Sequence, residues 1–132
     1  MLKLELARVR GVTEGEALVS EEGFSPRYDL DRETGIISRP GHAIQGESIA
    51  GRILFFPTAK GGIAAGWAFY DLVGKNIAPA AIVFGTANPV MVQGAVFAGI
   101  TIAECPTFAE QVQTGDRVVI EPDNMSLTVH GS

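Results

Sequence analysis

Lys60 is the residue around which a chemical site can most readily be built. It stands in the run Thr58-Ala59-Lys60-Gly61-Gly62, between a short apolar segment that predicts a strand and a longer one that predicts a helix. A loop leading from a strand into a helix presents unpaired backbone N–H groups, and glycines let an anion approach them closely. Lysine adds a positive charge. The pattern predicts a site for a carboxylate or phosphate, with a plain strand-to-helix connection as the alternative.

A second candidate loop follows the next apolar strand and lies within residues 85–94. Asn88 and Gln93 could offer amides to the same ligand, because open α/β sheets bind ligands beyond the carboxyl ends of their strands. Asn88 also precedes Pro89, and this pair is typical of a helix N-terminus, where asparagine caps and proline occupies the first position. The residue types favour the cap over the ligand contact.

The two histidines and the single cysteine give weaker indications of chemistry. Neither His42 nor His130 has a Cys, Asp or Glu at metal-ligand spacing, so no metal site is predicted within the chain. His42 follows Pro-Gly and is interpreted as a turn residue, with a ligand contact as the lesser alternative. Cys105 is interpreted as a buried thiol rather than a nucleophile, because no basic residue is near it in sequence.

Two strand–helix units and a third strand are expected to position these loops. Short apolar runs predict buried strands, and apolar spacing near 3.6 residues predicts helices. The first strand should stop at Pro57, which cannot donate to a sheet, and the first helix should be buried almost all round, including Trp67 and Tyr70. Consecutive units of this kind favour a parallel sheet. In chain order the expected elements are a strand at 53–56, a helix from 63, a strand at 80–84, a helix at 90–98 and a strand at 100–103.

Shorter elements are expected on both sides of this centre. The 132 residues predict one domain, rich in strands and loops because sixteen of them are glycine. The flanking elements are strands at 2–9 and 16–20 around a turn at 11–15, an irregular hairpin at 28–37, one or two helical turns at 106–112 and a closing hairpin formed by 117–121 and 125–129.

Composition and charge narrow the classes of partner. The net charge is −5 and the basic residues are scattered, which argues against a nucleic-acid partner. The sequence as given begins without an apolar signal core and contains no run of about 18 apolar residues, so neither secretion nor a membrane partner is expected. A single cysteine agrees with a reducing compartment. The expected location is the cytoplasm.

Several segments, taken in order, resemble the small subunit, or swivelling domain, of the aconitase X family. The resemblance covers almost the whole chain and implies an α/β fold: a swivelling β/β/α domain similar to the mobile domain of aconitase, with a mixed sheet or barrel around central βα units. The segments that carry it are Asp31-Arg32-Glu33-Thr34-Gly35-Ile36, Pro40-Gly41-His42, Ser48-Ile49-Ala50-Gly51, Phe56-Pro57, Lys60-Gly61, Ala78-Pro79-Ala80-Ala81-Ile82 and Thr114-Gly115-Asp116.

The resemblance also implies a function. Members of the family are hydro-lyases that remove water from small hydroxy acids, among them mevalonate 5-phosphate and cis-3-hydroxy-L-proline. The implied partner is a large catalytic subunit that carries the iron or iron–sulfur centre and most substrate ligands, so no cofactor is expected in this chain. A single loop lysine slightly favours a catabolic substrate over a phosphorylated one.

Gly62 departs from the family pattern. In the family the loop usually reads close to Lys-Gly-Ser, and its serine is the base that abstracts a proton. Gly62 stands in that position, and glycine has no side chain to serve as a base. The remaining candidates are neutral Lys60 or a group of the large subunit, ranked above Thr58. The expected substrate-binding residues are Lys60, Gly61, Gly62 and Asn88.

The missing serine keeps a second class of function open. The chain would then be a non-catalytic binding or regulatory partner of the large subunit. A third interpretation is a self-associating module whose apolar surface is the interface.

Overall fold

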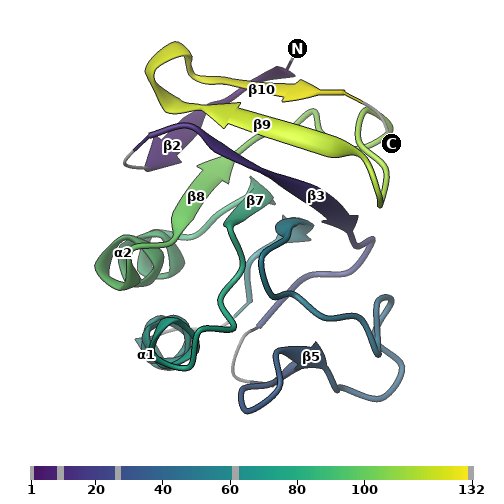
Figure 1. Ribbon diagram of the computed structural model, residues 1–132, viewed down its shortest axis with the longest axis vertical. Helices are drawn as coiled ribbons and strands as arrows, with labels where there is room; N and C mark the ends of the chain where they lie inside the picture. Colours follow the sequence, from purple (N-terminus) through teal and green to yellow (C-terminus); the bar gives the residue numbers. More distant parts are fainter. Residues whose placement is uncertain (1, 9–10, 26–27, 61–62, 131–132) are drawn as a thin grey trace.

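A parallel sheet forms the centre of the computed structural model, which describes residues 2–8, 11–25, 28–60 and 63–130 (Figure 1). Four parallel strands lie side by side, and two helices connect the last three of them and cover one face of the sheet. These elements are β3 (Thr13–Val19), β6 (Ile53–Thr58), α1 (Ile63–Gly74), β7 (Ala81–Thr86), α2 (Pro89–Ala98) and β8 (Thr101–Glu104). The predicted βα units and their parallel order are confirmed.

The N-terminal segment closes the sheet into a barrel. β1 (Leu2–Lys3) pairs with β10 (Ser126–Val129), and β2 (Leu6–Arg8) pairs with β8 at the opposite end of the strand order β1-β10-β9-β3-β6-β7-β8-β2. β9 (Arg117–Glu121) pairs antiparallel with both β10 and β3 and so lies between them. A short 3-10 turn, η1 (Pro122–Asn124), connects β9 to β10. One segment therefore supplies both sheet edges, which is why the strand predicted at 2–9 is divided in two.

Apolar side chains of the parallel strands pack on both faces of the sheet. Along β6, Phe55 points into the barrel and Phe56 points toward the helices, and Val83 and Phe84 do the same along β7. Alternation of side chains between faces makes each strand apolar throughout when both faces are covered. The expectation of buried, wholly apolar strands is confirmed, and Cys105 is buried on the barrel side.

Pro57 does not end its strand, contrary to prediction. β6 continues to Thr58, which pairs with Thr86 of β7. β3 pairs with β6 only as far as Phe55, so Pro57 lies beyond the point where β3 would require a donor from β6. The proline is tolerated because it is on a locally unpaired side of the strand.

The predicted burial of α1 is wrong for Trp67 and Tyr70. Ala68, Phe69 and Leu72 are buried against the sheet, whereas Trp67 and Tyr70 are exposed. The sequence could not separate the two faces, because both are apolar. The helix ends at Gly74, and α2 ends at Ala98, as predicted, before Gly99, which adopts the left-handed conformation of a C-cap.

The flanking elements differ from prediction in two places. The turn expected at 11–15 is shorter, because β3 already begins at Thr13. The helical turns expected at 106–112 are not formed; this stretch makes irregular turns that place Phe108 and Val112 against the barrel core. The hairpin at 28–37 is confirmed as β4 (Leu30–Asp31) and β5 (Ile36–Ile37), with Gly35 at a φ of 77° in its turn.

Gly85 allows β6 and β7 to approach each other closely, and its replacement by alanine should be destabilising. A Cβ atom at this position would lie 2.8 Å from the carbonyl oxygen of Pro57. We expect Gly85→Ala to lower the free energy of unfolding by about 1–3 kcal/mol, as overpacking does elsewhere. Urea unfolding of Gly85→Ala and Gly74→Ala tests this, because a Cβ at Gly74 meets nothing within 4 Å. Equal stability of the two variants would contradict the prediction.

Candidate functional site

The loop carrying Lys60 is fixed against a second loop at residues 20–25. The Phe24 N–H donates to the Thr58 carbonyl at 3.2 Å, and the Lys60 N–H donates to the Phe24 carbonyl at 2.8 Å. A side chain on Gly23 would collide with Thr58, because its Cβ would lie 2.7 Å from Thr58 Oγ1. Glycine at position 23 therefore permits the close approach that sets the backbone at Lys60.

Asp29 pairs with both Lys60 and Arg39. Its side chain is fully buried, and its Oδ2 lies 3.2 Å from Lys60 Nζ. The same oxygen accepts the Ser25 N–H at 2.9 Å, and Oδ1 accepts an N–H of Arg39 at 3.0 Å. The Asp29 carbonyl also accepts the N–H groups of Ser38 and Arg39, at 2.9 and 3.3 Å. Asp29 thus ties the Lys60 loop to both surrounding loops.

The environment of Asp29 favours its ionised form. Burial alone would raise the pKa of this carboxyl group, but the hydrogen bonds from Arg39 and the Ser25 N–H, followed by the hydrogen bond and charge of Lys60, outweigh it. The net effect is a pKa below the usual value for aspartate. Two cations, Arg39 and Lys60, share this single buried carboxylate.

His42 is a buried structural member of this cluster. Its Nδ1 accepts the Ile44 N–H at 3.3 Å, which leaves the proton on Nε2, and Nε2 donates to the Gly23 carbonyl at 3.0 Å. This pattern assigns the neutral ring. Nε2 is also 3.7 Å from Asp29 Oδ2 and 3.8 Å from Glu22 Oε2. His42 lies at a turn, as expected, and its N–H donates to the Arg39 carbonyl at 3.2 Å.

Thr58 and Lys60, two of the predicted site residues, are both accessible to solvent. Thr58 is exposed, and Lys60 retains 37% side-chain exposure although it is paired with Asp29. The pairing of Thr58 with Thr86 brings the loops after β6 and β7 to the same sheet edge, so Lys60 and Asn88 follow neighbouring strand ends. Gly61 and Gly62 lie outside the described residues.

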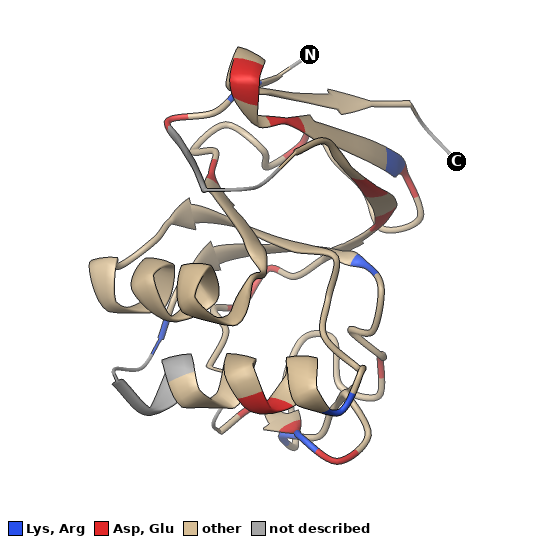
Figure 2. Ribbon diagram, turned by 60° about the vertical axis from the view of Figure 1, so that its left-hand side comes forward, with Lys and Arg blue, Asp and Glu red and all other residues tan. Residues whose placement is uncertain are grey.

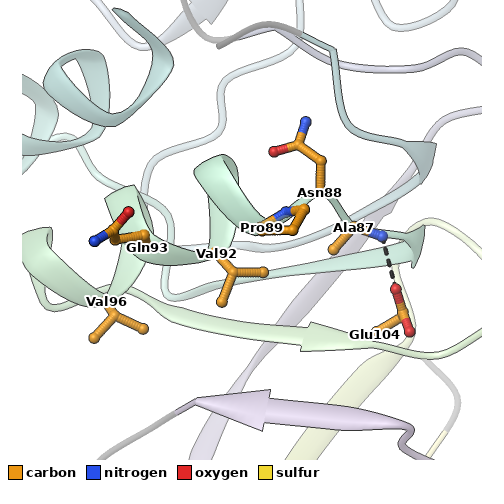
Figure 3. Close-up of a pocket in the computed structure, with 7 residues that line it drawn as sticks. All are labelled: Ala87, Asn88, Pro89, Val92, Gln93, Val96 and Glu104. Atoms are coloured by element: carbon orange, nitrogen blue, oxygen red, sulfur yellow. Dashed lines mark hydrogen bonds between the residues drawn. The ribbon is translucent and has the colours of Figure 1, made fainter. Parts of the chain in front are cut away.

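Asn88 caps α2, as the residue types favoured. Its Oδ1 accepts the Met91 N–H at 2.7 Å, and Pro89 begins the helix. Beside it, an open groove of about 480 Å³ runs between α2 and β8 (Figure 3). Val92 and Val96 point to one side of α2, while the Asn88 amide points away from them. The residues lining the groove are Ala87, Asn88, Pro89, Val92, Gln93, Val96 and Glu104.

Removing the cap should weaken α2 measurably. We expect Asn88→Ala to lower the free energy of unfolding by about 1 kcal/mol, since one N–H of the first turn loses its acceptor. Asn88→Asp keeps an acceptor at the positive end of the helix and should stay near the wild-type value. Thermal or urea unfolding measures both variants. An alanine variant as stable as the aspartate variant would show that the cap contributes little.

The described residues contain neither a metal-binding cluster nor a membrane-spanning helix. Within residues 2–8, 11–25, 28–60 and 63–130, no group of three or more His, Cys, Asp or Glu side chains is arranged to hold a metal ion. No helix in the described part of the chain is long and apolar enough to cross a membrane.

Asp29 and Arg39 are the site residues that sequence reasoning missed. Asp29 stands in Tyr-Asp-Leu, at the entrance to a predicted hairpin, where an aspartate is unremarkable. Arg39 directly precedes the Pro-Gly-His run and has no local pattern that marks it as a site residue. The sequence separates both from Lys60 by more than 20 residues, so their contact depends on how the loops fold over the strand end. The Pro-Gly-His run is the one available signal, and the sequence predicts a turn there, with a ligand contact of His42 as the lesser alternative.

Comparison with known proteins places this geometry in a family. A family model described as the aconitase X swivel domain matches residues 5–129. The chain belongs to the aconitase X swivel-domain family. It is similar to the phosphomevalonate dehydratase small subunit of Archaeoglobus fulgidus, with 41% identity over 119 residues that cover 89% of each chain. It is 37% identical to the protein of that name from Thermococcus gammatolerans, over 92% of each chain.

A solved structure extends the similarity to three dimensions. The chain superimposes on a chain of Thermococcus kodakaraensis aconitase X, determined in the holo-form, with a TM-score of 0.86 and 33% identity over 92% of both chains. The predicted fold class and the family resemblance are therefore confirmed. The Lys60 loop and its charged cluster lie at the carboxyl end of β6.

Proposed function

We propose that this chain is the small subunit of an aconitase X-type hydro-lyase and that it contributes the Lys60 loop to an active site shared with a large subunit. The relatives named phosphomevalonate dehydratase small subunit support a dehydratase and a large-subunit partner. The single observation that carries the loop assignment is the 3.2 Å contact between Lys60 Nζ and the buried Asp29 carboxylate.

That contact suits Lys60 for binding an anion. The carboxylate holds the ammonium group in one place while part of the lysine side chain stays exposed to an incoming ligand. Lysine carries a compact positive charge with three hydrogen-bond donors, so it suits the binding of negative charge better than the abstraction of a proton. In the proposed mechanism Lys60 binds and orients a carboxylate or phosphate of the hydroxy acid and stabilises charge that develops there during loss of water.

Proton abstraction is then assigned to the large subunit. Thr58 is exposed, and an alcohol is by itself a poor proton acceptor near neutral pH. The iron or iron–sulfur centre of such an enzyme also belongs to the large subunit in this proposal. The described residues of this chain offer no ligand set for it, and none of the steps assigned to the chain passes through a metal.

Co-expression with an aconitase X large subunit from the same organism tests the proposal. The two polypeptides should purify together and dehydrate a small hydroxy acid, whereas neither should do so alone. Mevalonate 5-phosphate is the first substrate to assay because of the names of the relatives, and cis-3-hydroxy-L-proline is the second. Failure to associate would refute the proposal, and full activity of the large subunit alone would favour the non-catalytic alternative.

The sequence departure at Gly62 allows a sharper test of that alternative. Gly62→Ser restores the residue that the family resemblance leads one to expect in the loop. A large gain in dehydration by the complex would indicate a site that has lost its base. Unchanged or reduced turnover would support a proton acceptor on the large subunit, as proposed here.

A further inference from the structure

Three aromatic side chains form an exposed cluster over the two helices. Trp67 and Tyr70 of α1 and Phe97 of α2 are 64%, 54% and 68% exposed, and we call this set the aromatic face. The Phe97 ring centroid lies 6.4 Å from that of Trp67 and 5.6 Å from that of Tyr70. Aromatic side chains gathered on the surface in this way are characteristic of protein interfaces, where Trp, Tyr and Phe are enriched.

The aromatic face is also nearly free of charge. In the 12 residues of α1 and the 10 of α2, the only Asp, Glu, Lys or Arg is Asp71, which is paired with Lys75 at 3.0 Å. Figure 2 shows both helices almost entirely without charged residues, while acidic and basic residues lie over the loops and the β9–β10 side of the molecule. Exposed Val73 and Val96 carry the apolar character along the same two helices. Depletion of charge is what distinguishes the core of an interface from the remaining surface.

We propose that the aromatic face docks on an apolar surface of the large subunit. This inference rests on the proposed function, because the Lys60 loop then has to face that subunit. An interface of standard size covers about 800 Å² of each partner, which corresponds to a circle of about 16 Å radius. Trp67 and Tyr70 lie about 6 and about 10 Å along the helix from Ile63, just after the loop. A partner that reaches Lys60 with an interface of that size extends over α1.

The position of the aromatic face favours the large subunit over a second copy of the chain as its partner. A second copy seated on Trp67 and Tyr70 would stand beside the N-terminal end of α1. It would then compete for the space through which the large subunit must reach the Lys60 loop. The large subunit, in contrast, can cover the loop and the aromatic face together and remove both from water. Self-association is therefore an outcome that the test has to detect.

Trp67 provides a direct probe, because it is the only tryptophan of the chain. The chain labelled with 5-fluorotryptophan is mixed with unlabelled large subunit, and the fluorine resonance is followed together with its broadening by a soluble paramagnetic reagent. In the complex we expect a shifted resonance and at least a fivefold fall in that broadening. A complex in which Trp67 remains as accessible as in the free chain would overturn the docking inference and leave the proposed function standing.

Charge substitutions on the aromatic face test its contribution to affinity. Trp67→Glu and Phe97→Glu should each weaken association with the large subunit at least tenfold, as expected for aromatic residues central to an interface. Val12→Glu is the matched control, because Val12 is similarly exposed but lies on neither helix, just before β3. All three positions are exposed, so circular dichroism should show folded variants. Unchanged affinity in both aromatic variants would overturn the inference.

Two remaining outcomes are also decisive. If the free chain is a dimer by light scattering and Phe97→Glu makes it monomeric, the face belongs to a second copy and the inference fails. If the wild-type chain does not bind the large subunit at all, the proposed function and the inference fail together.

Discussion

Replacing Asp29 by alanine should lower the free energy of unfolding by about 2–4 kcal/mol. The substitution removes a buried carboxylate that accepts hydrogen bonds from Arg39 and the Ser25 N–H and pairs with Lys60. Hydrogen bonds to charged groups contribute about 1.5–3 kcal/mol each, and breaking a fully buried pair costs about 3–5 kcal/mol. The loss expected here is smaller than for a fully buried pair, because Arg39 and Lys60 retain access to water and can be hydrated again.

Urea unfolding of the full chain measures this effect against an exposed ion pair. Glu33 is the control, because its carboxylate lies 2.7 Å from Lys75 Nζ but is largely exposed. Glu33→Ala should cost less than about 1 kcal/mol, since exposed pairs are screened by water. Asp29→Asn keeps the shape of the side chain and should fall between the two alanine variants. Equal losses for Asp29→Ala and Glu33→Ala would show that Asp29 is not the centre of the cluster.

Protonation of Asp29 should also lower the free energy of unfolding at acid pH. The pKa of Asp29 in the folded chain is below its ordinary value, so the folded state binds this proton less readily than the unfolded state does. Its stabilising contribution is therefore complete above the unfolded pKa of about 3.9 and is lost as the pH falls through the folded pKa. We expect Asp29→Asn to lose less stability than the wild type between about pH 5 and pH 2. An equal fall in the free energy of unfolding of both proteins over this pH range would contradict the prediction.

The central fold could be predicted because local pattern and tertiary structure agree there. The apolar runs that became β6 and β7 are covered on both faces, and the Asn88-Pro89 cap and Gly99 stop delimit α2 by local chemistry alone. Prediction failed where partners distant in sequence decide the outcome. The N-terminal strand is divided because one segment meets β10 and β8, and Pro57 is tolerated because β3 has already ended.

The site could be predicted only in part for the same reason. Lys60 was identified because a lysine beside two glycines at a strand end has a local meaning. Asp29 has none until the hairpin loop folds over the end of β6 and brings its carboxylate to 3.2 Å from Lys60 Nζ. Trp67 illustrates the converse, because an apolar residue at helical spacing predicts a buried position only when the opposite face of the helix is polar. Exposure of an aromatic residue is information that periodicity does not contain.

Lys60→Ala should reduce kcat/KM of the complex with the large subunit by about 100-fold or more. The variant removes the cation that the loop presents to the substrate, and losing one such electrostatic contact costs about 10²–10³ in rate where it acts on developing charge. Folding should be affected less than by Asp29→Ala, because the lysine side chain is partly exposed and Asp29 keeps its contacts with Arg39 and Ser25. Steady-state kinetics of the complex with the hydroxy acid that it dehydrates provides the measurement.

The partition of the Lys60→Ala effect between the two kinetic constants identifies the role of the lysine. A rise in KM with kcat unchanged would assign Lys60 to binding of a group remote from the reaction, whereas an equal fall in kcat and kcat/KM would assign it to charge that develops during loss of water. Lys60→Arg keeps the charge and should retain more activity than Lys60→Ala. Lys75→Ala is the matched control, because that lysine pairs with Asp71 and Glu33 at the far end of α1 and should leave the kinetics unchanged. If Lys60→Ala behaves like Lys75→Ala, the loop does not contact the substrate, and the chain acts on its partner by binding alone.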